Sequence, residues 1–313
     1  MIRVIRLLLI TYCAIIMSGC HTAAPLAEDA HEFTVLVVNS NSTLPRYNVP
    51  AQAFSKMMGG IRQIQVDLAD DEQPIDTLQD ILNKNDVHAV YCIGAKALGS
   101  VDYLSPATPI IYSSVLSWRE FQSRKQFYGV TDGVAPAAQL AWFKHFFPDI
   151  NTIGILYSET SAELLNEAKQ SAEALSLTIQ AGKVSASSQR EKVINELLDT
   201  TDAIWVLPDP VVLDSEANTI QLFELAHRKQ VPVFAYNQFF MELGATLSIN
   251  ADLATTGRQA ALMIRSLKQN VEPENNIQFP AGSNVSLNLR KVKQYRMTLD
   301  SDALNSVSEL LDQ

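Results

Sequence analysis

The stretch QFYGVTD at Gln126–Asp132, followed by PAAQLAWFKHFF at 136–147, separates two halves of the chain that repeat one pattern. The segments before it are FTVLVVNS at 33–40, IRQIQVDL at 61–68, IDTLQDILNKNDVHAVYCIGAKAL at 75–98 and TPIIYSSV at 108–115. The corresponding segments after it are NTIGILYS at 151–158, LTIQAGKV at 177–184, REKVINELLDTTDAIWVLPDPVVL at 190–213 and VPVFAYNQ at 231–238. Two copies of one α/β unit predict two Rossmann-like lobes with parallel sheets, joined by a hinge.

The same arrangement predicts where a ligand binds. Ligands of open parallel sheets lie outside the carboxyl ends of the strands, so the cleft between two such lobes is the expected site. Gly129 supplies a flexible point for the hinge. We interpret Asp132 as the N-cap of the helix at 136–147, with contact to the ligand as the alternative.

Short polar or small residues follow the apolar runs of the first half. The ligand-binding candidates in this half are Asn39, Ser40, Asn41, Gly94, Ala95, Ser113 and Ser114. The first three also suit an Asx or Ser turn into a helix. Gly94 precedes a helix whose free N–H groups would suit a carboxylate. The two serines have neither a G-x-S-x-G pattern nor a paired base, so we expect binding or turn formation from them, and no catalysis.

The second half supplies five more candidates, which are Tyr157, Asp209, Tyr236, Asn237 and Asp252. Asp209 lies between two prolines directly after a strand, so we expect a stiffly held carboxylate that binds a cationic group of the ligand. A stiff surface turn is the alternative. We expect Tyr157 and Tyr236 to flank an apolar part of the ligand. Asp252 suits either the ligand or the N-cap of the following helix.

The N-terminus has the pattern of a lipoprotein leader. Arg3 and Arg6 precede the apolar run LLLITYCAIIM, and Met17-Ser18-Gly19-Cys20 looks like a bacterial lipobox. We therefore expect cleavage before Cys20 and lipidation of its thiol, with an ordinary signal peptide as the alternative. Residues 20–32 would then form a flexible tether. Cys92 would be the one remaining cysteine, packed in a strand.

Composition excludes several classes of protein. The 313 residues are 47% hydrophobic and 19% charged, and the formal net charge is −10. No basic stripe with interleaved aromatic residues is present, so we expect no nucleic-acid partner. After residue 30 no apolar run reaches the ~20 residues that a membrane helix needs. The sequence has no nucleophile–base pair, no metal-ligand motif and no phosphate loop, so we expect no enzyme activity, metal or cofactor.

The ordered motifs resemble the ABC-transporter substrate-binding family that includes aromatic amino-acid binders. The matching segments are YGVTD at 128–132, NTIGILYSETSAELLNEAKQSAEALSL at 151–177, TDAIWVLPDPVVL at 201–213, VPVFAYN at 231–237 and LGATLSINADLATTGRQAALMI at 243–264, with looser matches at 88–100 and 108–115. The resemblance implies a type-I periplasmic binding-protein fold, a small-molecule ligand and an ABC permease as partner. Ala95-Lys96 and Pro210 stand where family members often have Thr-Pro and Asn.

We therefore expect an extracytoplasmic, lipid-anchored solute-binding protein. Its predicted parts are a signal peptide (1–19), a tether (20–32), an N-terminal lobe (33–129 plus 253–275) and a C-terminal lobe (130–252 plus 276–313). The ligand would be small and polar or zwitterionic, with an amino acid as one candidate, and an ABC permease would receive it. The nearest alternative is a periplasmic sensor that acts on a membrane receptor without transport. A hydrolase and a purely structural lipoprotein are the remaining alternatives.

Overall fold

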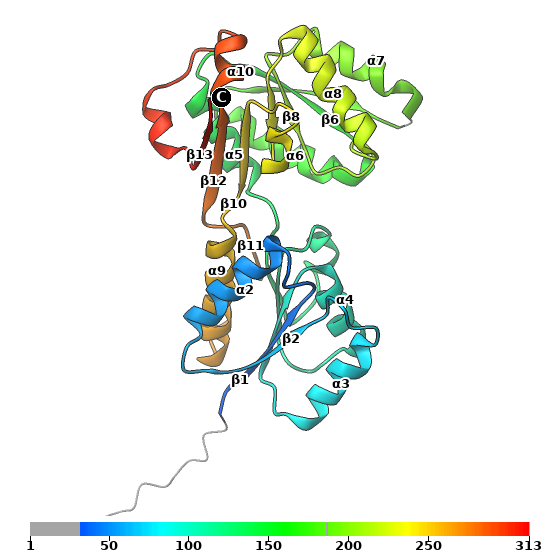
Figure 1. The fold of residues 1–313 in the computed structure, drawn as a ribbon, viewed down its shortest axis with the longest axis vertical. Coiled ribbons are helices and arrows are strands. Elements are labelled where there is room, and N and C mark those ends of the chain that lie inside the picture. The colour runs from blue at the N-terminus through cyan, green and yellow to red at the C-terminus, as the bar shows by residue number, and fades with distance from the viewer. Residues whose placement is uncertain (1–31, 186, 313) are drawn as a thin grey trace, which may run out of the picture. The chain divides into compact units, whose positions relative to one another are not determined.

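The computed structural model describes residues 32–185 and 187–312, in which two mostly parallel β-sheets form the framework (Figure 1). The first sheet contains β1 (Thr34–Asn39), β2 (Arg62–Asp67), β3 (Ala89–Ile93), β4 (Ile110–Ser113), β5 (Phe127–Val130) and β11 (Ile277–Gln278). The second contains β6 (Thr152–Tyr157), β7 (Thr178–Lys183), β8 (Ala203–Val206), β9 (Val233–Ala235), β10 (Leu247–Ala251), β12 (Ser283–Asn288) and β13 (Glu309–Leu311).

The strand orders confirm the duplication that the sequence predicts. The first sheet has the order β11-β5-β4-β3-β1-β2, and the second has β13-β12-β10-β9-β8-β6-β7. Strands β1 to β5 therefore occupy the same relative places as β6 to β10. Each set has the doubly wound order 2-1-3-4-5, in which polar groups at the carboxyl ends of the strands reach a common edge. The predicted fold class, two Rossmann-like lobes of parallel strands, is confirmed.

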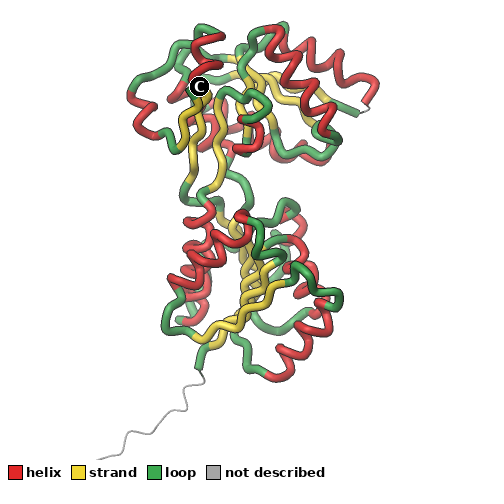
Figure 2. Tube along the Cα trace, viewed as in Figure 1, coloured by secondary structure: helices red, strands yellow, loops and turns green. Residues whose placement is uncertain are grey.

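Four helices cover the first sheet. Helices α2 (Pro45–Met57) and α9 (Leu253–Lys268) share one apolar core with the sheet, and α3 (Pro74–Lys84) and α4 (Ala95–Leu104) share another (Figures 1 and 2). Along β3, Tyr91 belongs to the first core and Val90 to the second, and both are fully buried. A strand buried on both faces explains why β1 and β3 read as unbroken apolar runs.

The second sheet has a similar pair of cores. The first includes residues of α5 (Pro136–Phe146) and α6 (Ala162–Glu173), with Phe143 of α5 packing against Trp205 and Phe234 of the sheet. The second includes residues of α7 (Ser187–Leu198) and α8 (Glu216–Lys229). This order of strands and helices directs the carboxyl ends of β8, β9 and β10 to one edge of the sheet, as in the first lobe.

The chain passes between the two sheets three times. The passages are residues 131–135 between β5 and α5, Asp252 between β10 and α9, and residues 279–282 between β11 and β12. Strand β11 pairs with β5, so residues 277–278 belong to the first sheet, although the sequence boundary at 276 assigns them to the C-terminal lobe. We propose that the lobe boundaries follow the sheets and that the last one lies at 279–282.

Two elements differ from the sequence interpretation. The apolar spacing of Ala260, Ala261, Ile264 and Leu267 predicts a helix that begins at Gly257, but α9 begins at Leu253, because Asp252 accepts a hydrogen bond from the Ala254 N–H and caps it. The sequence also predicts a closing helix at 303–311; this prediction is wrong, and the segment forms a 3-10 helix (Asp302–Ser306) and then β13. The physical reason is that β12 offers an open edge, with which β13 pairs in parallel.

The leader and the tether lie outside the described residues, and so does Cys20. Within 32–185 and 187–312, no helix is both long and apolar enough to cross a bilayer. Cys92 is a free, buried cysteine in β3, which agrees with the packing role expected for it.

Candidate functional site

A hollow of about 430 Å³ lies where α2, the first passage, the end of β9 and the end of β10 meet. We name it the Arg46 hollow. Its lining consists of Pro45, Arg46, Asp132, Tyr236, Asn237, Gln238, Phe239, Glu242, Asn250, Ala251 and Leu253. The volume is in the range of roughly 300–1,000 Å³ that is usual for small-molecule sites. The lining comes from both halves of the chain, as expected for a ligand cleft at strand ends.

The central polar pair of this hollow is Arg46 and Asp132. Nη2 of Arg46 lies 3.3 Å from Oδ1 of Asp132, and the two side chains are 42% and 24% exposed. Asp132 does not cap α5, because the N-cap position belongs to Ala135, which has no side-chain cap. The preferred interpretation of Asp132 as a cap is therefore wrong, and its alternative role in the site is the one that the geometry favours.

The environment of this pair raises the pKa of two acidic groups. Burial raises the pKa of Asp132, and the positive charge of Arg46 only partly offsets that effect. Burial also raises the pKa of the Tyr236 hydroxyl, and the nearby charge of Asp132 adds to it. Asp132 is thus a partly desolvated carboxylate, which gains from a cationic partner more than an exposed one does.

Two buried atoms of the lining lack a hydrogen-bond partner within the described part of the chain. They are Nε of Arg46, a donor, and Oδ1 of Asn250, an acceptor. Buried polar atoms in folded proteins nearly always have a partner, so atoms of this kind in a hollow are suited to a ligand or to water. One offers a hydrogen bond to an anion and the other accepts one from a cation.

Aromatic side chains form an apolar wall beside the charges. Tyr236 packs edge-on against Phe240, with ring centroids 5.3 Å apart, and Phe239 is 58% exposed. Both Tyr236 and Phe239 line the hollow. An exposed phenylalanine at the rim of a polar site offers contact to an apolar ligand group. Tyr236 and Asn237 are therefore sequence candidates that the structure places in the lining.

The candidates at the end of β1 build the support of this hollow. Asn39 donates from Nδ2 to the carbonyl of Tyr47, the residue after Arg46, at 3.1 Å, and its Oδ1 accepts from the Asn41 N–H at 2.9 Å. Ser40 Oγ accepts from the N–H of Ala97, in the first turn of α4, at 3.0 Å. The N-terminus of α4 was expected to hold an anionic group of the ligand. Its Ala97 N–H already donates to Ser40 Oγ.

Gly94 and Ser114 have backbone roles in the same support. Gly94 has φ +92°, and a Cβ there would lie 2.5 Å from Ser40 Oγ, so a larger residue would displace that serine. Ser114 donates from Oγ to the Arg46 carbonyl at 3.2 Å. Ser113 is fully buried and bonds to the Tyr91 hydroxyl at 2.7 Å. These groups position α2 and its Arg46 and are not part of the lining.

Asp209 has a different role from the one expected. Its carboxylate is 2% exposed and accepts five hydrogen bonds, from the N–H and the hydroxyl of Ser158, the hydroxyl of Ser161, and the N–H groups of Val211 and Val212. Burial raises its pKa, but these hydrogen bonds outweigh burial and hold the pKa below its ordinary value. The geometry therefore favours a residue that fixes the ends of β6 and β8 over a direct ligand contact.

The remaining candidates do not line the hollow either. Asp252 lies between two lining residues, but its carboxylate caps α9 and pairs with Arg258 at 3.5 Å. Tyr157 packs at the edge of the α5–α6 core, and Ala95 is exposed in the first turn of α4. In residues 32–185 and 187–312, no group of three His, Cys, Asp or Glu side chains is arranged to hold a metal ion.

The comparison with protein-family models now identifies the chain. The model described as "ABC transporter substrate binding protein" matches residues 62–310. The protein belongs to this family. The resemblance noted in the motifs is thereby confirmed, and the fold of the substrate-binding protein agrees with it. No curated protein sequence matches the chain.

Solved structures share the fold at low sequence identity. A substrate-binding protein with adhesive properties from Clostridium difficile, in a ligand-free, open structure, is 15% identical; the match covers 90% of this chain and 100% of that chain, with a TM-score of 0.70. An ABC domain in complex with L-Trp from Streptococcus pneumonia is 17% identical over 90% and 100% of the chains, with a TM-score of 0.59. A conserved domain protein from Vibrio cholerae is 17% identical over 89% and 99%, with a TM-score of 0.58.

Sequence reasoning missed Arg46, although a signal was present. Arg46 follows the polar end of β1 by seven residues and is the one Lys or Arg between Arg6 and Lys56. A lone cation beside a predicted strand end could have been selected as a partner for a ligand anion. The predicted candidates were short polar side chains at strand ends, and long basic residues are usually solvated, so Arg46 was not among them.

Proposed function

We propose that the substrate-binding protein captures a small zwitterion with an apolar side group, such as an amino acid, and delivers it to an ABC permease. In this proposal, the Arg46 guanidinium binds the ligand carboxylate, and Asp132 with Asn250 Oδ1 binds the ammonium group. Tyr236 and Phe239 contact the apolar part. The mature protein would be attached outside the cytoplasm through lipid on Cys20.

The Arg46–Asp132 pair is the observation that carries the proposal. The pair joins opposite charges in a hollow that also holds a spare donor and a spare acceptor. A zwitterion has a complementary group for each, whereas a simple anion or cation would leave one of the two charges without a ligand partner. A guanidinium is well suited to a carboxylate because its N–H groups can donate in parallel.

Capture also requires that the ligand favour a closed form. The three passages between the sheets are the segments in which backbone rotation would change the position of one lobe against the other. Asp132 lies in the first passage and Ala251 and Leu253 flank the second, so ligand contacts and hinge backbone share residues. A ligand shifts this equilibrium only by the difference in its affinity for the two forms.

The experiment is ligand discovery followed by two charge-removing variants. Each of the twenty standard amino acids is tested for a rise in melting temperature, and binding of the best one is measured by calorimetry. We expect Arg46→Gln and Asp132→Asn each to weaken its affinity by about tenfold or more, because a hydrogen bond to a charged group contributes ~1.5–3 kcal/mol. Arg62→Gln is the matched control, since Arg62 in β2 bonds Asn85 and is not in the lining.

Two further outcomes decide the proposal. Affinity should weaken as the pH falls toward the raised pKa of Asp132, because protonation removes the charge that the ammonium group binds. If no amino acid binds, or if both variants bind with the affinity of the Arg62→Gln control, the assignment of a zwitterionic ligand to this hollow is rejected.

A further inference from the structure

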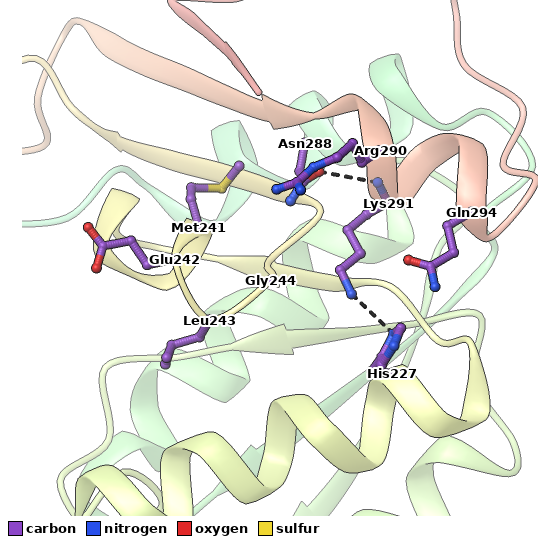
Figure 3. Close-up of a pocket in the computed structure, with 9 residues that line it drawn as sticks. All are labelled: His227, Met241, Glu242, Leu243, Gly244, Asn288, Arg290, Lys291 and Gln294. Carbon is purple, nitrogen blue, oxygen red and sulfur yellow. Dashed lines mark hydrogen bonds between the residues drawn. The ribbon is translucent and has the colours of Figure 1, made fainter. Parts of the chain in front are cut away.

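A second hollow, of about 390 Å³, lies near the other end of β10 (Figure 3). The Arg46 hollow touches Asn250 and Ala251, where β10 ends, whereas this one touches Gly244, which precedes the start of β10. We name it the Lys291 hollow. Its lining consists of His227, Met241, Glu242, Leu243, Gly244, Asn288, Arg290, Lys291 and Gln294. Three of these side chains are basic.

Lys291, in the short helix α10 (Leu289–Gln294), contacts an imidazole and a phenol. Its Nζ lies 3.1 Å from His227 Nδ1 and 3.3 Å from the Tyr295 hydroxyl (Figure 3 shows the first contact). Neither partner is a carboxylate, so neither cancels the charge of the ammonium group. One of its three N–H donors stays available beside these two contacts.

The glycine opposite Lys291 leaves room beside this ammonium group. Gly244 has φ +95°, and a Cβ at that position would lie 3.2 Å from Lys291 Cε and 3.5 Å from Nζ. Any other residue would therefore crowd the space over the charge. The backbone of Lys291 is fixed as well, because its N–H donates to Asn288 Oδ1 at 3.2 Å.

The positive charge in this hollow is not balanced by nearby acid groups. Within residues 32–185 and 187–312, neither Arg290 nor Lys291 has a carboxylate within ion-pair distance. Glu242, the one carboxylate of the lining, lies across the hollow with its side chain turned away from Lys291 (Figure 3). Burial and the charge of Arg290 both lower the pKa of Lys291, so an anion here would relieve an unfavourable interaction.

We propose that the Lys291 hollow binds a small oxyanion of the phosphate type. Lys291 and Arg290 supply the charge, Gln294 offers an amide donor, and Gly244 provides the space. Lys and Arg are the residues that usually bind phosphate oxygens, through short charge-assisted hydrogen bonds. The lining of this site has Glu242 in common with the Arg46 hollow, but the residues proposed to bind the oxyanion do not line that hollow, and the site does not depend on the ligand proposed there.

Calorimetry with inorganic phosphate, against sodium chloride of equal ionic strength, tests the site. We expect phosphate to bind at ~1 mM or tighter and chloride to bind far more weakly, because a spherical monoanion has a lower charge and no separate oxygen atoms for the donors of different side chains. Lys291→Met and Arg290→Gln should each weaken phosphate binding about tenfold or more. Lys169→Met is the control, since Lys169 is exposed in α6 and outside the hollow.

Histidine NMR gives an independent readout should a variant be poorly folded. Phosphate should shift the imidazole signals of His227 in the unmodified protein and leave those of His88 and His145 in place. His227→Gln identifies the signal. The proposal is overturned if phosphate shifts the signals of His227, His88 and His145 alike, if it leaves the signal of His227 in place, or if Lys291→Met binds phosphate as tightly as Lys169→Met.

Discussion

Asp209 shows at the residue scale how a buried carboxylate stabilises a fold. Five donors from two loops converge on its two oxygens, so the side chain is a fixed junction between the ends of β6 and β8. Because the hydrogen bonds lower its pKa in the folded protein, the ionised form contributes stability above the unfolded pKa of ~4. That contribution is lost as the pH falls through the lower, folded pKa.

Asp209→Asn tests this role. We expect the free energy of unfolding at pH 7 to fall by about 1–3 kcal/mol, because either orientation of the amide places its NH₂ against at least one backbone N–H, which can only donate. The difference from the unmodified protein should shrink as the pH falls below about 4, where the carboxylate becomes protonated in the unfolded chain, and should be smallest below the lower pKa of the folded protein. Urea denaturation at several pH values is the measurement. Asp199→Asn, at an exposed ion pair with Lys229, should change stability by less than ~0.5 kcal/mol.

Residue roles were the part of the site that sequence predicted least well. Asp209 and Asp132 both follow strands, and only the three-dimensional neighbours distinguish them. Three of the five donors around Asp209 come from residues about fifty positions earlier in the chain, and the partner of Asp132 is 86 positions away. The pattern of residue types along the sequence does not show which of these distant residues are neighbours in the folded protein. Tyr236 and Asn237 were predicted, because a strand end alone was enough to place them.

At the scale of elements, helices α2 and α9 of the first lobe pack with their backbones in close contact. Gly257 of α9 lies against the backbone of Pro50 in α2, and a Cβ there would lie 2.1 Å from the Pro50 carbonyl oxygen. Backbone cannot move aside as a flexible side chain can. The pair therefore fixes how closely the helix that bears Arg46 lies to the helix after the second passage.

Gly257→Ala should separate these helices and reduce the free energy of unfolding by about 1–3 kcal/mol, the usual effect of overpacking. Gly99→Ala is the matched control, because a Cβ at Gly99, also in a helix, meets nothing within 4 Å. Alanine there should stabilise the protein by ~0.5–1 kcal/mol. Urea denaturation is the measurement. A Gly257→Ala protein with the same free energy of unfolding as the unmodified protein, or a higher one, would contradict the close contact.

Elements followed from local pattern wherever the pattern was long. The sequence pattern predicts strands at 33–38, 88–93 and 203–206 and helices at 73–84 and 136–147. The corresponding elements β1, β3, β8, α3 and α5 lie within two residues of these bounds, since buried strands and amphipathic helices have clear apolar signatures. The end of the chain did not follow, because Glu and Leu at 309–311 favour a helix by local propensity, whereas the segment forms β13. Its pairing with β12 is a tertiary contact that a short sequence window cannot contain.

At the scale of the whole molecule, the proposed lipid attachment at Cys20 would determine where capture takes place. We expect Cys20→Ser to move the protein from the membrane fraction to the soluble extracytoplasmic fraction, because serine has no thiol to accept the lipid. Fractionation and immunoblotting of cells that express each form is the measurement, with Cys92→Ser as the control that keeps the anchor. A Cys20→Ser protein that still sediments with membranes would exclude lipid attachment at this residue.

The three passages between the sheets have a consequence for how the molecule can be divided. Neither half is a continuous stretch of polypeptide, since α9 and β11 return to the first sheet after the second is nearly complete. A gene cut at residue 131 would therefore encode a first lobe without β11 and without α9, one of the two helices that cover one side of its sheet. An exchange of one whole lobe between relatives, made to transfer binding specificity, would therefore need at least three junctions between the two sequences. These junctions would lie in the three passages between the sheets.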